Sequence, residues 1–299
     1  ALSSAASDVY KRQEICEYYG LPFINLKFPI DERPSLEQIE QILKENQDIA
    51  LVYITHNETG TGILNPIREI GALAHAYGAI FVVDTTSTYA MRPINIKNDN
   101  IDFCMASAQK GLMAMTGISF VVGKRTIIEQ SKTYPKRSYY CNLYMQYHYF
   151  EAHGEMHFTP PVQTVYAMRQ AIKEYFAEGE QKKWERHTRV FEALHKGIER
   201  LGFQDMIKRD WQAGLVVTVK YPDDPNWSFS AIHDYCYKRG FTIYPGKINN
   251  TETFRLCALG AIDQSDIETF FEVFEAGLRE MEVSLPVHYG LEEETDERE

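Results

Sequence analysis

Two charged residues, Asp84 and Lys110, stand where apolar, strand-like runs come to an end. Asp84 closes AIFVVD (79–84), and Lys110 follows shortly after IDFCMAS (101–107). Taken singly, the aspartate is most simply a helix N-cap or turn residue, and the lysine a surface residue whose ammonium reaches water. Together they are 110 − 84 = 26 residues apart, which leaves room for one crossover that brings both to the same edge of a parallel sheet.

A carboxylate and a lysine at one sheet edge would suit pyridoxal 5'-phosphate. The lysine can form a Schiff base with this cofactor, and the carboxylate can keep the pyridine nitrogen protonated so that the ring accepts electrons. Such a lysine has to lose its proton near neutral pH. Lys110 lies within MASAQKGLMAM (105–115), and we expect this apolar setting to favour the neutral amine.

The surrounding runs predict an α/β fold. Strands are expected at IALVYIT (49–55), AIFVVDTT (79–86), IDFCMAS (101–107) and GISFVVGK (117–124), and an amphipathic helix at PIREIGALAHAYG (66–78). Near-continuous apolar strands that alternate with helices indicate a mostly parallel sheet covered by helices on both faces. Open sheets of this kind bind ligands beyond the carboxyl ends of their strands, where Asp84 would lie.

The second half of the chain changes character. Residues 162–200 predict two long helices, and the strands and helices between 214 and 281 predict a smaller α+β unit. The first residues, ALSSAASDVYKRQ, lack a clear apolar period. The predicted division is therefore a non-native leader at 1–13, a large cofactor-binding domain at 14–190, a small C-terminal domain at 191–285 and an acidic tail at 286–299.

Composition narrows the class of protein. A net charge of −11 argues against a general nucleic-acid surface, which needs clustered lysine and arginine. No apolar run is long enough for a membrane span. The five cysteines are widely separated and odd in number, which favours reduced thiols in a cytoplasmic protein over a disulfide framework.

Several motifs resemble the class V aminotransferases among the fold-type I pyridoxal-phosphate enzymes. They are HNETGTG (56–62), VDTTS (83–87), SAQK (107–110), YPGKI (244–248) and FRL (254–256). The resemblance extends from about residue 14 to about residue 281. It implies a fold-type I transferase with a smaller C-terminal domain. Within the family the similarity is greatest to enzymes that exchange an amino group between 2-aminoethylphosphonate and pyruvate, giving phosphonoacetaldehyde and L-alanine, so we expect that reaction.

The resemblance also implies roles for residues near the cofactor ring. Lys110 matches the lysine that forms the Schiff base, and Asp84 matches the aspartate under the pyridine nitrogen. Thr59 matches a hydroxyl that hydrogen-bonds the phenolic oxygen of the cofactor. Thr86 matches the residue packed against the ring face opposite the substrate.

Three further residues carry implied binding roles. Gln109 matches a polar residue near the cofactor phosphate, and Thr159 matches one that reaches the phosphate of a neighbouring subunit, which implies a homodimer with shared active sites. Arg255 matches the arginine that binds the acid group of the substrate. A guanidinium suits that role because its planar donors can bind a carboxylate or phosphonate through two hydrogen bonds.

The chain departs from the family in two places. Family members carry, before the position matching residue 14, a glycine- and serine-rich turn that binds the cofactor phosphate at a helix N-terminus, whereas no such turn precedes Asp84 here. We therefore expect an N-terminally truncated copy with weak or absent cofactor retention. The family also tends to carry Ser-Ser-Phe-Gly-Gly where this chain has STYAM (87–91), and the bulk of Tyr89 and Met91 is expected to reshape the nearby wall.

Other patterns are given simpler interpretations. The histidines of HGEMH (153–157) would need a continuous helix to share a metal ion, and Gly154 weakens helix there, so no metal site is expected. Lys247 is either a solvated turn residue or a second cation near the substrate acid.

Three functions remain open from the sequence. Beside the 2-aminoethylphosphonate reaction, the chain would suit another class V transaminase of the alanine– or serine–glyoxylate type. It would also suit a non-catalytic fragment that retains the fold. The joint presence of Asp84, Lys110 and Arg255 favours an enzyme.

Overall fold

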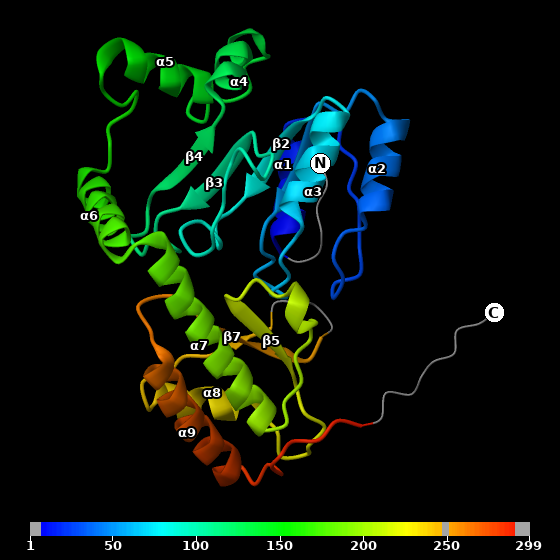
Figure 1. Cartoon of the computed structure of the whole chain (residues 1–299), viewed down its shortest axis with the longest axis vertical. Helices are drawn as coiled ribbons and strands as arrows, with labels where there is room; N and C mark the ends of the chain where they lie inside the picture. Colours follow the sequence, from blue (N-terminus) through cyan, green and yellow to red (C-terminus); the bar gives the residue numbers. More distant parts are fainter. Residues whose placement is uncertain (1–6, 247–250, 291–299) are drawn as a thin grey trace, which may run out of the picture. The chain divides into compact units, whose positions relative to one another are not determined.

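The computed structural model describes residues 7–246 and 251–290, which belong to two compact units (Figure 1). The first unit comprises residues 1–59 and 63–185, and the second comprises 60–62 and 186–299. The division falls within helix α7 (Glu180–Arg200). The boundary predicted at residue 190 lies in the same helix.

The first unit is built on a four-stranded sheet in the order β1-β2-β3-β4. Strands β1 (Leu51–Thr55), β2 (Ile80–Asp84) and β3 (Phe103–Ser107) are parallel, and β4 (Ser119–Gly123) is antiparallel to β3. The predicted strands and the mostly parallel sheet are thus confirmed. In the register, Thr55 pairs with Asp84, so β1 and β2 end side by side.

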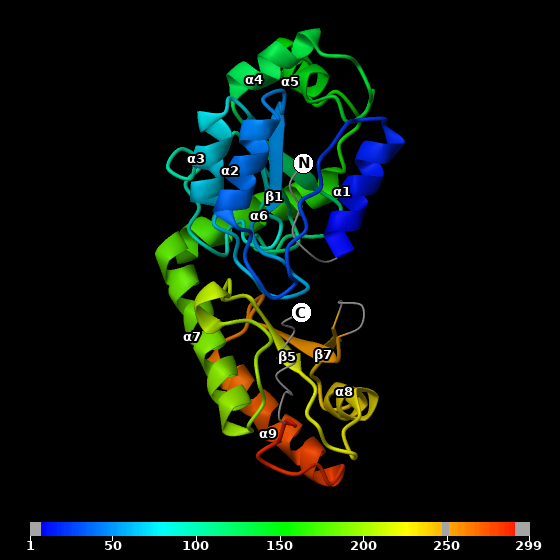
Figure 2. The ribbon, with the colours of Figure 1, turned by 90° about the vertical axis from the view of Figure 1, so that its right-hand side faces the viewer.

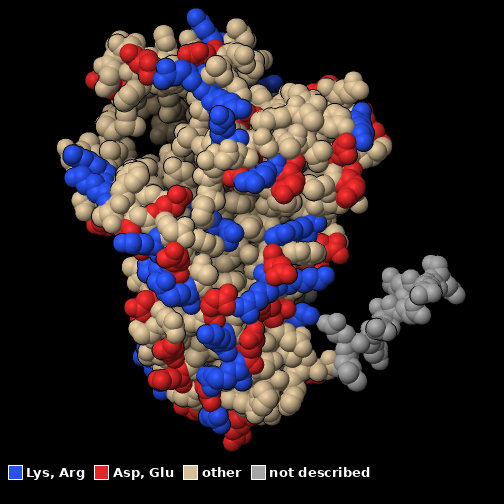
Figure 3. Space-filling view, viewed as in Figure 1, with Lys and Arg blue, Asp and Glu red and all other residues tan. Residues whose placement is uncertain are grey.

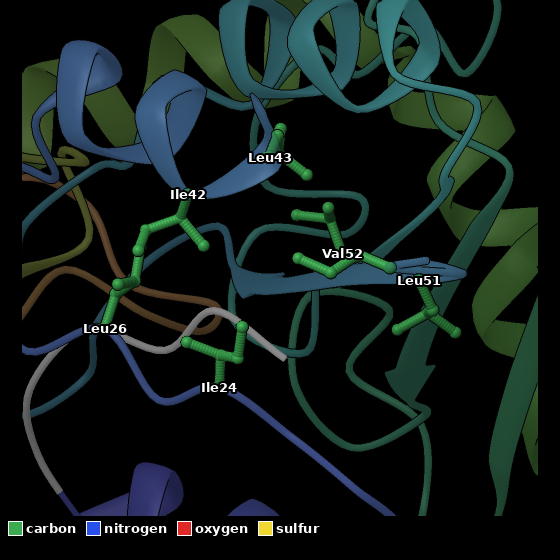
Figure 4. A pocket seen from close by; sticks show the side chains of 7 residues that line it. Ile24, Leu26, Ile42, Leu43, Leu51 and Val52 are labelled. Atoms are coloured by element: carbon green, nitrogen blue, oxygen red, sulfur yellow. The ribbon is translucent and has the colours of Figure 1, made fainter. Parts of the chain in front are cut away.

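The two faces of this sheet differ in chemistry. Because side chains alternate along a strand, Val83 and its neighbour Asp84 point to opposite faces. Val83 joins a core formed with α2 (Leu36–Glu45) and α3 (Ile67–Ala76). Figure 2 shows both helices on that side of β1 and α1 (Ser7–Tyr18) on the other. A small apolar pocket lies beside the α2 packing (Figure 4) and is lined by Ile24, Leu26, Ile42, Leu43, Ile49, Leu51 and Val52.

Helix α1 continues across the boundary that the sequence suggested at residue 13. It runs without interruption from Ser7 to Tyr18, so residues 7–13 are not a separate segment within the described part of the chain. Residues 1–6 of the proposed leader lie outside the described residues.

The remaining helices of the first unit follow β4. They are α4 (Arg125–Gln130), the short 3-10 helix η1 (Ser131–Thr133), α5 (Leu143–His153) and α6 (Val162–Glu178). Helix α5 ends at His153, and Gly154 caps it in the left-handed region with a φ of 71°. His157 therefore lies beyond the helix, and the four-residue spacing does not place the two histidine rings on one helical face.

The second unit is the predicted smaller α+β element. Strands β5 (Val216–Lys220), β7 (Thr253–Cys257) and β6 (Tyr244–Pro245) form an antiparallel sheet in that order. Its core is shared with the later part of α7, α8 (Phe229–Tyr237) and α9 (Gln264–Glu280). The short 3-10 helix η2 (Arg209–Trp211) precedes β5.

The surface is charged and mixed. On the face shown in Figure 3, acidic and basic side chains are interspersed rather than gathered by sign. Within the described ranges, none of the helices combines the length and apolarity needed to cross a lipid bilayer.

Candidate active site

Asp84 is a buried carboxylate at the carboxyl end of a central strand. Its side chain lies on the sheet face opposite the α2–α3 core, and the residue is 8% exposed. One carboxylate oxygen, Oδ1, accepts a hydrogen bond from the Thr86 backbone N–H at 2.9 Å. The other, Oδ2, accepts one from the Tyr53 hydroxyl at 3.2 Å. Two fixed donors thus orient the carboxylate.

A cation also contacts this carboxylate. The Arg12 guanidinium of α1 forms an ion pair with Asp84 Oδ2 and donates to the Tyr53 hydroxyl at 2.6 Å. It also lies over the Tyr53 ring, 4.7 Å from the centroid. Burial, reinforced by the charge of Asp84, raises the pKa of Tyr53, so its hydroxyl remains a donor at neutral pH. Asp84 is therefore placed to bind a positively charged N–H group.

Lys110 lies in a turn that follows β3, the neighbour of β2. The two strands are parallel, with Asp84 opposite Met105, so Asp84 and the Lys110 turn lie at the same edge of the sheet. The lysine side chain is exposed, and Met113 and Met115 beside it are 38% and 58% exposed. The expectation that an apolar surround shields Lys110 is wrong for this chain, because these methionines face outward as well.

The turn itself is tightly packed against the segment that departs from the family pattern. An added Cβ on Gly111 would lie 1.9 Å from the Tyr89 carbonyl oxygen and 2.6 Å from Met91 Cγ. Met91 is buried, at 2% exposed. Ala90, which stands where the resembled transaminases carry glycine, has a φ of 58°. Residues 89–91 thus form a wall against the turn that carries Lys110.

The segment after β1 is joined to the segment after β2 by buried polar contacts. His56 Nδ1 lies 2.9 Å from the Thr88 hydroxyl, and Asn57 Nδ2 donates to the Ser87 hydroxyl at 2.9 Å. Burial lowers the pKa of His56 to about 3, so the imidazole is neutral at physiological pH. These bonds hold the segment that leads to Thr59.

The remaining residues of the proposed cofactor site in the first unit are less buried. Thr59 and Thr86 are half-buried beyond the ends of β1 and β2, and Gln109 is half-buried in the turn before Lys110. Thr159 is exposed on the segment between α5 and α6. The implied roles of these four residues remain predictions.

Arg255 belongs to the second unit, on strand β7. It is 8% exposed, and its Nε donates to the Pro245 carbonyl oxygen at 3.1 Å. Desolvation lowers the pKa of its guanidinium from the ordinary value, without removing its charge at neutral pH. Lys247, the other basic residue considered for substrate binding, lies outside the described residues.

Sequence reasoning missed several residues that shape this site. Tyr53 had a signal: it is a polar ring inside the apolar strand LVYIT, two residues from Thr55, which pairs with Asp84. His56 belongs to the motif HNETGTG (56–62), and its contact with Thr88 was not predicted. The buried Lys183, in the charged run EQKKWER (180–186), gave no signal because its burial depends on tertiary packing.

The sequence is similar to a known protein family and to named members of it. The sequence profile of the family described as "Aminotransferase class-V" matches residues 5–242. The 2-aminoethylphosphonate–pyruvate transaminase 1 of Cupriavidus pinatubonensis is 33% identical over 273 residues, which cover 91% of this chain and 72% of that protein. The 2-aminoethylphosphonate–pyruvate transaminase of Lysinibacillus sphaericus is 32% identical over 88% of this chain and 71% of that protein.

Solved structures show the same fold. The ureidoglycine–glyoxylate aminotransferase of Bacillus subtilis superposes with a TM-score of 0.85 at 21% identity, over 95% of this chain and 74% of that one. The alanine–glyoxylate aminotransferase of Nostoc sp. superposes with a TM-score of 0.84 at 22% identity, over 93% of this chain and 75% of that one. The fold is thus that of the fold-type I aminotransferases.

Proposed function

Because the chain belongs to the class-V aminotransferase family, we propose that it exchanges an amino group between 2-aminoethylphosphonate and pyruvate, giving phosphonoacetaldehyde and L-alanine. The chain is an aminotransferase by family. Its relatives named 2-aminoethylphosphonate–pyruvate transaminase support this pair of substrates.

The residues of the first unit fit pyridoxal 5'-phosphate, the cofactor that the family implies. Asp84 already binds a cationic N–H donor, the Arg12 guanidinium, and a protonated pyridine nitrogen has the same charge and donor chemistry. Lys110 would hold the cofactor through its amine, with Thr59, Thr86 and Gln109 around it. When bound, the cofactor supplies an electron sink for the carbon that loses its proton.

The chain supplies the groups that hold and move protons. The Asp84 carboxylate, oriented by Tyr53 and the Thr86 N–H, would keep the ring nitrogen protonated. The free Nζ of Lys110 would be the natural base to take the proton from the substrate carbon and to deliver it to the cofactor carbon that accepts it. An exposed lysine on a packed turn suits this task because its long side chain can reorient while the backbone of the turn is held.

Arg255 would recognise the acid group of the substrate. A guanidinium can bind the phosphonate of one substrate and the carboxylate of the other through two parallel hydrogen bonds. Its Nε bond to the Pro245 carbonyl orients the guanidinium, whose terminal nitrogens would make such hydrogen bonds. Thr159 would serve the neighbouring subunit of a homodimer.

The observation that carries this proposal is the position of Asp84 and the Lys110 turn at the ends of adjacent parallel strands. We would incubate the protein with pyridoxal 5'-phosphate, 2-aminoethylphosphonate and pyruvate, and measure L-alanine. Alanine formation is expected, and Lys110→Ala should lower its rate at least about a hundredfold. Lys97→Ala, at an exposed lysine of the same unit, should leave it unchanged.

Two outcomes would decide against the proposal. If only amines that bear a carboxylate react, with pyruvate or glyoxylate as acceptor, the chain is a transaminase of the alanine– or serine–glyoxylate type. If no amine reacts and borohydride traps no cofactor on Lys110, the chain is a non-catalytic member of the family.

A further inference from the structure

We propose that Lys183 is a positioning residue that fixes the turn carrying Lys110. Lys183 lies near the start of α7, far from Lys110 in the sequence but in the same compact unit. Its significance for catalysis rests on the proposed role of Lys110, whereas the contact that carries it is independent of that role.

Lys183 is a buried lysine directed at the backbone. The residue is 1% exposed, and its Nζ donates a hydrogen bond of 2.5 Å to the Gly111 carbonyl oxygen. The same Nζ lies 5.2 Å from the centre of the Tyr175 ring, within reach of a cation–π interaction. Burial of an ammonium is unfavourable unless it is bonded, and the bond to Gly111 helps to compensate that cost for Lys183.

The bond is made at the residue next to Lys110. Gly111 also packs against Tyr89, whose carbonyl oxygen lies so close that no side chain could be added to the glycine. On the other side of Lys110, the buried Ala108 donates its N–H to the Ile118 carbonyl at 3.0 Å and accepts from the Ala114 N–H at 3.0 Å. Fixed residues therefore flank the lysine, and Lys183 supplies the hydrogen bond to the carbonyl of one of them.

This arrangement matters because the Lys110 side chain is exposed. With its long stem in solvent, the direction in which Lys110 leaves the sheet is set by the backbone on either side of it. Loss of the Lys183 amine would leave the buried Gly111 carbonyl without this donor and loosen the turn. Met113, whose N–H donates to the Lys110 carbonyl at 2.9 Å, lies in the same turn and can report such loosening.

Hydrogen exchange by the whole chain tests the proposal without cofactor. Lys183→Met keeps the length of the side chain and removes the donor, Lys183→Arg keeps a donor, and Lys182→Met is the matched control at the exposed neighbouring position. In Lys183→Met the amides of Met113 and Ala114 should exchange at least about fivefold faster than in the parent. Both other variants should stay close to the parent.

A second readout concerns Lys110 itself. Each variant is treated with pyridoxal 5'-phosphate and then borohydride, and the labelled lysines are mapped by mass spectrometry. Labelling of Lys110, relative to surface lysines, should fall at least about threefold in Lys183→Met and be retained in Lys183→Arg. If the parent itself shows no preference for Lys110, the proposed function fails, while the exchange data still decide the role of Lys183.

The proposal is overturned if a folded Lys183→Met exchanges the two amides at the parental rate. Should Lys183→Met not fold, Lys183→Gln, whose shorter amide falls short of Gly111, takes its place with the same expectation. Loss of the whole fold in both variants would equally overturn the proposal, because the amine would then hold the domain rather than the turn.

Discussion

At the scale of residues, the carboxylate of Asp84 is the most constrained group of the site. Thr86, Tyr53 and Arg12 all contact it, and the first two are donors that a bound ring nitrogen would leave in place. Arg12 is different, because its guanidinium occupies the carboxylate that the ring nitrogen needs. The Arg12 cation shows that the carboxylate can bind a charged N–H group, and it also competes with the ring nitrogen for that carboxylate.

Removal of Arg12 should strengthen cofactor binding. The Arg12–Asp84 ion pair is partly exposed, at 29% and 10% for the two side chains, so its loss is expected to change the binding free energy by about 1 kcal/mol. Arg12→Ala should therefore lower the Kd for pyridoxal 5'-phosphate about fivefold in a spectral titration. Arg68→Ala, which breaks an exposed ion pair with Asp99, is the control and should have no effect. An unchanged or higher Kd in Arg12→Ala would contradict the proposed competition between Arg12 and the ring nitrogen.

Ala90 is strained in a way that glycine would relieve. A φ of 58° is unfavourable for a residue with a Cβ and readily adopted by glycine. Ala90→Gly should raise the free energy of unfolding by up to about 1 kcal/mol, as measured by denaturant titration. Ala72→Gly, at an exposed position inside α3, should lower it by a similar amount. Destabilisation by Ala90→Gly would show that the left-handed backbone carries no strain.

At the scale of elements, the segments that follow β1 and β2 are bonded to each other. They are linked by the His56–Thr88 and Asn57–Ser87 contacts, which lie among buried atoms. His56 has to remain neutral for this arrangement, and its lowered pKa makes it a source of pH-dependent stability.

The sign of that dependence follows from the two pKa values. His56 titrates at about 3 when folded and at its ordinary value of about 6.5 when unfolded. Between these values the unfolded chain binds a proton that the folded chain does not, so stability falls as pH falls through 6.5 and towards 3. The contribution of His56 should be about 2 kcal/mol less at pH 5 than at pH 7.5.

The measurement is the free energy of unfolding at both pH values for the parent and for His56→Asn. Asparagine retains a polar group near Thr88 but does not titrate, so His56→Asn should lose less stability between pH 7.5 and pH 5. His153→Asn, at an exposed histidine, is the control and should behave like the parent. Equal slopes in the parent and His56→Asn would mean that His56 titrates normally in the folded chain.

At the scale of the whole molecule, each compact unit supplies part of the expected chemistry. The first unit holds Asp84 and Lys110, and the second holds Arg255. The first unit also exposes apolar side chains on one face of α6, where Val162, Val165 and Tyr166 are 48%, 39% and 63% exposed. Grouped apolar exposure of this kind marks interaction surfaces, and we predict that this face contributes to the homodimer.

Tyr166→Glu should weaken the dimer, because a buried carboxylate without a partner is unfavourable at an apolar interface. Sedimentation velocity should show a dimer for the parent and at least a tenfold higher Kd of dimerisation for the variant. Tyr237→Glu, at a similarly exposed tyrosine of the second unit, is the matched control. A parent that sediments as a monomer at all concentrations would refute the prediction.

The sequence by itself determined the strands of the first unit and their order along the chain. Apolar runs located the strands because a buried strand is recognised from a short local pattern. The parallel arrangement followed from strands that alternate with helices. The position of Asp84 and Lys110 after adjacent strands was predictable for the same reason. The family followed from motifs whose spacing is preserved along one chain.

Only the tertiary structure decided the environment of each side chain. Lys110 was expected in an apolar surround and is exposed, because neighbours in sequence are not neighbours in space once a turn directs Met113 and Met115 outward. The contacts of Arg12 with Asp84 and of Lys183 with Gly111 join residues 72 positions apart in each case. Burial and charge pairing arise from such distant contacts, and no local pattern contains them.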